Sequence, residues 1–156
     1  MRVFILIFTA LVAACRLAHA AETLSGPYPA QILRVINGDT VEARVHVWLG
    51  LDVTTRVHLR NMDSPELHGP CPDAGQAARD ALIGLLGDNP VILSRIANDK
   101  YGGRVDAVMT LPTGVDVSTA MLAAGHARKI KGDFNCPSTA PRAKGRTRAT
   151  PIWAPE

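Results

Sequence analysis

Residues 55–67, TRVHLRNMDSPEL, contain carboxylates with the type and spacing of a metal site. Asp63 and Glu66 stand on either side of Pro65, and Asp39 follows an Asn-Gly pair earlier in the chain. Like charges that lie within a few ångströms repel one another unless a cation lies among them. A hard divalent cation suits a ligand set made only of oxygen, and calcium tolerates irregular geometry best. The alternative interpretation is that turns are simply rich in Asp and Glu.

The hydrophobic pattern predicts the elements that would position these acids. Strands are expected at 29–36, 40–47, 53–61, 90–97 and 104–111, with one helix between Asp73 and Gly87 and a short one over 116–124. Asn37-Gly38 between two alternating runs is typical of a hairpin. Asp73 and Gln76 have the spacing of a capping box. Five short strands with an inserted helix predict a mainly β fold, a five-stranded Greek-key barrel of the OB type with added helices.

The second and third strands should pair as a hairpin around a turn at 48–52. In the expected register Glu42 lies opposite His58, and apolar residues face apolar residues. Arg56, His58 and Arg60 share one strand face by the period of two. Because the strands are antiparallel, the end of the third lies beside the start of the second. The three carboxylates should therefore gather at one end of the barrel.

The first 20 residues, MRVFILIFTALVAACRLAHA, have the features of a secretory signal peptide. Arg2 precedes an apolar run, and the segment ends in a small-x-small pattern. A second interpretation is a lipoprotein cleavage site at Cys15, in which case the chain would be anchored to a membrane. Both predict export, to the periplasm or the medium, and leave a domain over 21–136.

Cys71 and Cys136 are the remaining cysteines of the exported chain. An even pair in an oxidising compartment favours a structural disulfide over a catalytic thiol. The chain has a formal net charge of +3, and residues 128–148 hold seven cations and one acid. Such a basic segment favours phosphate backbones or anionic surfaces. The alternative is a solvated tail, and the composition of 137–156 predicts disorder.

Four segments together carry a resemblance to a known family. They are Asn37-Gly38-Asp39-Thr40-Val41, the run LRNMDSPEL at 59–67, the loop 99–104 (DKYGGR) and the run MLAAGHAR at 121–128. In this order, over about residues 30–130, they resemble the staphylococcal nuclease-like (thermonuclease) family. The resemblance implies an OB-fold enzyme that needs calcium and hydrolyses phosphodiester bonds of DNA and RNA with little sequence preference.

The resemblance also implies roles for individual residues. Asp39 and Asp63, with the backbone carbonyl of Ser64, correspond to the calcium ligands. Glu66 corresponds to the residue that activates the attacking water, and Arg104 to the loop arginine that stabilises the phosphate in the transition state.

Further positions are expected to contact the substrate. Lys100 and Tyr101 correspond to residues that contact the nucleotide, and Arg60 points from the same strand face toward the acidic end. His58 stands five residues before Asp63, where the family has a second catalytic arginine. Histidine offers one directed hydrogen bond per nitrogen, whereas arginine grips a phosphate with two.

Two functions follow from these residues. The first is an exported calcium-dependent nuclease that acts on DNA and RNA, slowed by His58 in place of arginine. The second is an OB-fold module that binds nucleic acid or nucleotides and has lost most catalysis. In both cases the chain is expected to be a monomer without a stable protein partner, at a membrane only if lipid-anchored at Cys15.

Overall fold

The structure is a computed structural model that describes residues 22–100, 102–129, 134 and 136. The expected signal segment 1–20 and the tail 137–156 lie outside these residues. The strands are β1 (Thr23–Leu24), β2 (Tyr28–Asn37), β3 (Thr40–Trp48), β4 (Leu51–Leu59), β5 (Val91–Asn98) and β6 (Arg104–Thr110), and the helices are α2 (Pro72–Leu86) and α3 (Val117–Ala123). No helix in the described part of the chain is long and apolar enough to cross a membrane.

Five strands close into a barrel. The order is β5, β2, β3, β4, β6, and β6 pairs back with β5. All of these pairs are antiparallel except β4 with β6, which are parallel. The predicted mainly β fold, a five-stranded barrel of the OB type, is therefore confirmed. The short strand β1 was not predicted, and it pairs with the second half of β5.

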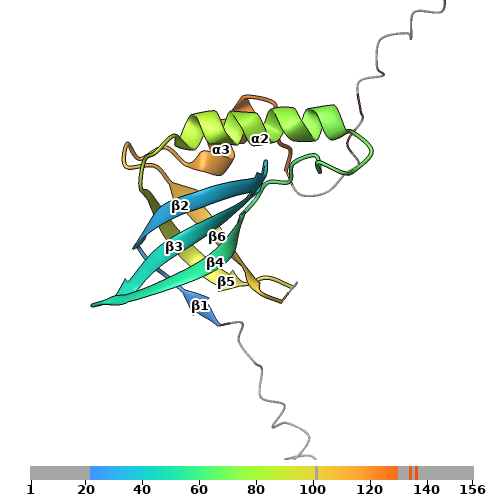
Figure 1. Ribbon diagram of the computed structural model, residues 1–156. Helices are drawn as coiled ribbons and strands as arrows, with labels where there is room; N and C mark the ends of the chain where they lie inside the picture. The colour runs from blue at the N-terminus through green and yellow to red at the C-terminus, as the bar shows by residue number, and fades with distance from the viewer. Residues whose placement is uncertain (1–21, 101, 130–133, 135, 137–156) are drawn as a thin grey trace, which may run out of the picture.

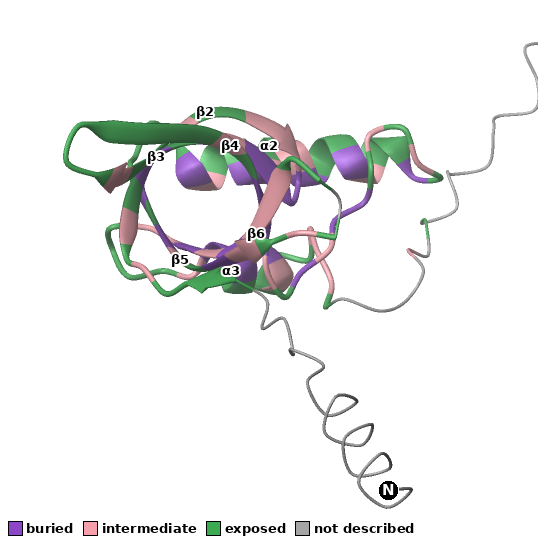
Figure 2. Ribbon diagram, turned by 90° about the horizontal axis from the view of Figure 1, so that it is seen from below, coloured by how far each residue is buried: buried purple, intermediate pink, exposed green. Residues whose placement is uncertain are grey.

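The core fills the barrel and extends to the helices, which lie across one end of it (Figure 1). The inward-facing strand residues Val41, Val57 and Leu59 are fully buried, and they alternate with polar residues that face outward. Leu82 of α2 and Met121 of α3 close the end of the barrel. Figure 2 shows the buried residues on the strands that ring the interior and on α2.

The hairpin of β3 and β4 has a different register from the expected one. Thr40, not Glu42, lies opposite His58, and Glu42 lies opposite Arg56. The expected turn was too long, because only Leu49 and Gly50 separate the strands and β3 bulges after His46. A shift of two residues keeps every side chain on its face, so the core pattern did not reveal it.

Helix α2 begins without the predicted capping box. Its N-cap is Cys71, whose side chain makes no capping hydrogen bond, and Pro72 stands in the first turn. Proline fits there because its fixed φ suits a helix and its missing N–H would have no partner. Asp73 lies inside the helix, and the Gln76 side chain donates to Asp80 instead. The predicted end of the helix at Gly87 is confirmed, since Gly87 is its C-cap and the Gly87 amide donates to the Ile83 carbonyl.

Candidate active site at the end of the barrel

Close packing against α2 positions the turn that carries Asp39. A Cβ added at Gly38 would lie 2.6 Å from Cβ of Ala78 in α2, so only glycine lets this turn meet the helix. The Asp39 carbonyl accepts from the Leu59 amide at 2.9 Å, which joins the start of β3 to the end of β4. Its carboxylate accepts from the Ser64 amide at 3.0 Å and from the Thr40 hydroxyl at 2.8 Å. The side chain is only 11% exposed.

The turn that carries Asp63, Ser64 and Glu66 is held from several sides. Asp63 exchanges two backbone hydrogen bonds with Arg128, at 2.9 and 3.0 Å. Gly75 of α2 packs so closely that a Cβ there would lie 2.5 Å from the Glu66 carbonyl oxygen. The turn is thus fixed by the barrel, by the helix and by the segment after α3.

A pocket of about 560 Å³ gathers most of the predicted residues. It is lined by Asn37, Asp39, His58, Met62, Asp63, Glu66, Asp99, Lys100, Arg104 and Asp106. The expected carboxylates therefore share one pocket. In the described part of the chain, however, no group of three or more His, Cys, Asp or Glu side chains lies close enough to hold a metal ion. The oxygen donors suit a hard cation, and their role as its ligands stays a prediction.

His58 lies between two carboxylates at the floor of this pocket. Its Nδ1 is 3.0 Å from Oδ1 of Asp106, and its Nε2 is 3.9 Å from Oδ2 of Asp39. Asp106 lies directly across the parallel pair of β4 and β6. The expected neighbour Glu42 is engaged elsewhere: its carboxylate accepts from Arg34 Nε at 2.7 Å, and this hydrogen bond lowers the pKa of Glu42.

Lys100, in the loop between β5 and β6, and Arg104, the first residue of β6, both line the pocket. The Arg104 side chain forms an ion pair with Asp99, whose side chain is only 5% exposed. The Asp99 amide also donates to the Arg104 carbonyl at 3.2 Å. Asp99 therefore fixes the direction of the guanidinium. Tyr101 lies outside the described residues.

Two predicted residues do not line this pocket. Arg60 follows the end of β4, and its Nε lies 3.4 Å from the Asp106 carbonyl oxygen, so the side chain is directed at β6. Ser64 is a buried residue of the turn, and its hydroxyl has no hydrogen-bond partner among the described residues. Substrate contact by Arg60 and a metal bond from the Ser64 carbonyl stay predictions.

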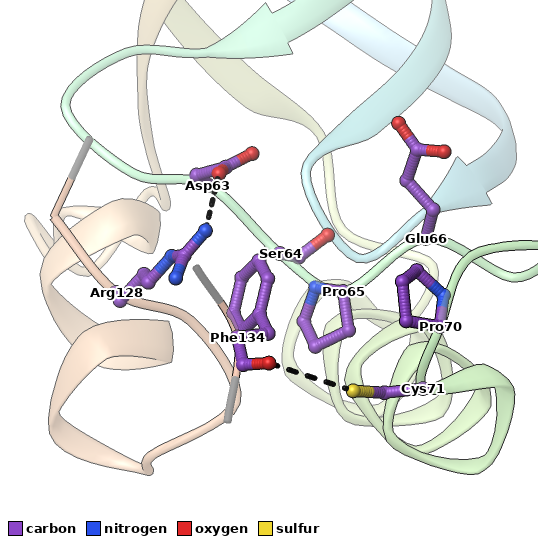
Figure 3. A pocket seen from close by; sticks show the side chains of 8 residues that line it. All are labelled: Asp63, Ser64, Pro65, Glu66, Pro70, Cys71, Arg128 and Phe134. Atoms are coloured by element: carbon purple, nitrogen blue, oxygen red, sulfur yellow. Dashed lines mark hydrogen bonds and ion pairs between the residues drawn. The ribbon is translucent and has the colours of Figure 1, made fainter. Parts of the chain in front are cut away.

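A second pocket, of about 360 Å³, shares Asp63 and Glu66 with the first (Figure 3). The Arg128 guanidinium stacks 3.5 Å above the ring centre of Phe134, and its Nη2 lies 3.4 Å from Oδ2 of Asp63. A disulfide joins Cys71 to Cys136, with the Cα atoms 5.5 Å apart. In Figure 3 the Glu66 carboxylate points away from Phe134, Pro70 and Cys71.

The sequence interpretation missed Asp99, Asp106 and Arg128 as parts of the site. Asp106 carried a signal, because it stands two residues after Arg104 on the same face of a predicted strand. Arg128 was named as the last residue of the run MLAAGHAR and as a cation of the basic segment, but it was given no role in the site. The partners of these residues are 5 to 65 positions away, and only the fold brings the distant ones together.

Comparisons with known proteins do not assign the chain to a family. No protein-family model matches it, and no curated protein has a matching sequence. A function must therefore be inferred from the pocket and from the chemistry of its residues.

Proposed function

We propose that this chain is an exported calcium-dependent nuclease that hydrolyses phosphodiester bonds of DNA and RNA with low sequence specificity. One observation carries the proposal: Asp39, Asp63 and Glu66 share a pocket with Arg104 and Lys100. An acidic group suits the activation of water, and neighbouring cations suit a phosphate. The disulfide between Cys71 and Cys136 supports export, because such bonds persist in oxidising compartments.

Each side chain has a task in this chemistry. The exposed Glu66 carboxylate accepts a proton from the water that attacks phosphorus, the P–O bond to the leaving oxygen breaks, and that oxygen takes a proton from solvent. Arg104, held in place by Asp99, donates hydrogen bonds to the phosphate oxygens as negative charge develops on them. Calcium would be held by Asp39, Asp63 and the Ser64 carbonyl, and it would supply positive charge that neutralises the phosphate.

His58 sets the expected rate. With Nδ1 directed at Asp106, only Nε2 faces the Asp39 side of the pocket, so the ring offers the phosphate one directed hydrogen bond. An arginine would offer two parallel bonds and a permanent charge. Loss of one transition-state donor costs on the order of a hundredfold or more in rate. The proposal is therefore a slow nuclease.

The second candidate is a catalytically weakened OB-fold module that binds nucleic acid or nucleotides. The engagement of His58 by Asp106 favours it, because that ring nitrogen cannot reach a substrate at the same time. Both candidates use the same pocket. The two candidates differ in whether a phosphodiester bond of the bound nucleic acid is hydrolysed.

Plasmid cleavage separates the two candidates. The nuclease should nick plasmid DNA in calcium and not in excess chelator. Glu66→Gln should lower the rate by roughly a hundredfold or more. Glu22→Gln is the matched control, because Glu22 is exposed and does not line this pocket. Full cleavage in chelator, or equal rates for both variants, would contradict the proposal. Binding of DNA without any cleavage would favour the second candidate.

A further inference from the structure

Two rows of polar side chains cross the outward face of β3, β4 and β6 beside the candidate active site. The first row is Thr40, His58 and Asp106, which are aligned by the pairing of the three strands. The second row lies two residues further along each strand toward the hairpin turn. It contains Glu42, Arg56 and Arg104 in the same alignment.

The cation at the centre of the second row, Arg56, shares the Glu42 carboxylate with a second arginine, Arg34. Glu42 is its neighbour on β3, but both Glu42 oxygens accept from Arg34, at 2.7 and 3.4 Å. Arg56 is exposed, and its charge helps to lower the pKa of Glu42, but its guanidinium makes no ion pair within 4.0 Å with any residue that the structure describes. A charged group left in this way is available to an anionic ligand.

A small pocket opens around Arg56. Its volume is about 240 Å³, and it shares Asn37 and Arg104 with the candidate active site. The described residues that line it include two arginines and no carboxylate, whereas five carboxylates line the active-site pocket. The two adjoining pockets thus differ in charge. The active-site pocket is rich in acids, whereas the positive charge of the pocket around Arg56 attracts anions.

We propose that Arg56 forms a second phosphate subsite, which binds the phosphodiester next to the one that is cleaved on the same nucleic-acid strand. Two residues along a strand span roughly 6.7 Å, comparable with the separation of successive phosphates along a nucleic-acid chain. A nucleic-acid strand with one phosphate at His58 would therefore place the next phosphate at Arg56. This inference rests on the proposed function for the position of the first phosphate.

A subsite of this kind gives the protein a preference for substrates with more than one phosphodiester. A backbone contact carries little base information, so the preference would not depend on sequence. Arg56 would act as a binding residue for the polymer.

The first test is binding of a fluorescent single-stranded octathymidylate, measured by anisotropy in calcium. All proteins carry Glu66→Gln so that the strand stays intact. Arg56→Ala should raise Kd roughly tenfold, and Arg56→Lys by less, because lysine keeps the charge without the bidentate geometry. The slope of log K against log salt should fall by about 0.7 in Arg56→Ala, the value for one phosphate of a single strand.

Arg44→Ala is the matched control, since Arg44 is exposed on the same face and lines neither pocket. It should change Kd less than twofold. A Kd for Arg56→Ala within twofold of the parent would overturn the subsite. Equal losses for both variants would also overturn it, because they would indicate general attraction by positive charge.

The second test uses cleavage and separates this inference from the proposed function. Without Glu66→Gln, Arg56→Ala should lower the ratio of kcat/KM for trithymidylate, with two phosphodiesters, to kcat/KM for dithymidylate, with one. An unchanged ratio would count against the subsite. If the unsubstituted protein cleaves neither substrate, the nuclease proposal fails, and the anisotropy test still decides the role of Arg56.

Discussion

The hydrogen bond between His58 and Asp106 leads to a sharp prediction. Nδ1 and Oδ1 are 3.0 Å apart, and the side chains are 17% and 33% exposed. Asp106→Ala removes the carboxylate and leaves the parallel pairing of β4 and β6 unchanged. The chain offers its own control, because His46 and Asp52 make the same kind of contact at 2.8 Å, with side chains 52% and 51% exposed.

The two pairs should differ in stability because they differ in exposure. A hydrogen bond to a charged group contributes about 1.5–3 kcal/mol when it is shielded from water. Partial exposure places the Asp106 bond near the lower limit, so Asp106→Ala should lower the free energy of unfolding by roughly 1.5 kcal/mol. An exposed pair contributes less, so Asp52→Ala should cost roughly 0.5 kcal/mol or less. Urea unfolding of both variants measures the difference.

The bond should also determine how His58 faces the pocket. In a neutral imidazole, the hydrogen bond at one nitrogen sets which nitrogen carries the proton. Nitrogen-15 spectra should therefore show the proton on Nδ1 of His58, and Asp106→Ala should remove this preference. In a His58→Ala background, Asp106→Ala should cause no further loss of cleavage, because residues that act together are not additive. Equal destabilisation by Asp106→Ala and Asp52→Ala, with unchanged His58 signals, would refute the reasoning.

Four further predictions test the site and its support. Calcium should raise the unfolding temperature, because binding to the folded state stabilises it. Asp63→Asn should remove both this stabilisation and most of the cleavage activity, while the protein stays folded. Full cleavage in chelator would contradict this prediction. His58→Arg should raise the cleavage rate, and an unchanged rate would mean that His58 does not contact the phosphate. Reduction of the disulfide should lower the free energy of unfolding by roughly 4 kcal/mol in the chain-entropy model, since the cysteines are 65 residues apart. If intact mass after thiol alkylation showed two alkylatable thiols in the unreduced, natively exported protein, the bond would be excluded. Gly75→Ala should lower the free energy of unfolding by about 1–3 kcal/mol, because its methyl group would meet the Glu66 carbonyl. Gly84→Ala in the same helix, where an added Cβ would have nothing within 4 Å, should raise the free energy of unfolding by about 0.4–1 kcal/mol. Equal effects in urea unfolding would refute the close contact at Gly75.

The barrel could be predicted from the sequence because its signals are local. Alternation along β3 and β4, the Asn37-Gly38 turn and Gly87 after α2 each depend on a few neighbouring residues. The capping box at Asp73 was wrong for the opposite reason. The start of α2 depends on Pro72 and on Cys71, which is bonded to a residue 65 positions away, so the local pattern did not determine it.

The partners within the site could be predicted only in part, and the reason lies in strand register. The order of strands in an OB barrel places β6 parallel to β4, so the predicted fold already implied that Asp106 lies next to one of the polar residues of β4. Alternation restricts the choice to Arg56 and His58 of β4 and to Arg60, which follows the strand, because these share the outward face. Which of the three it meets depends on a register that no turn of fixed length sets, since β4 and β6 are joined through α2 and β5. A slip of two residues would pair Asp106 with Arg56, neutralise the second row and leave His58 without its partner. The same composition would then make a different site, so the chemistry of this pocket depends on the register of one parallel strand pair.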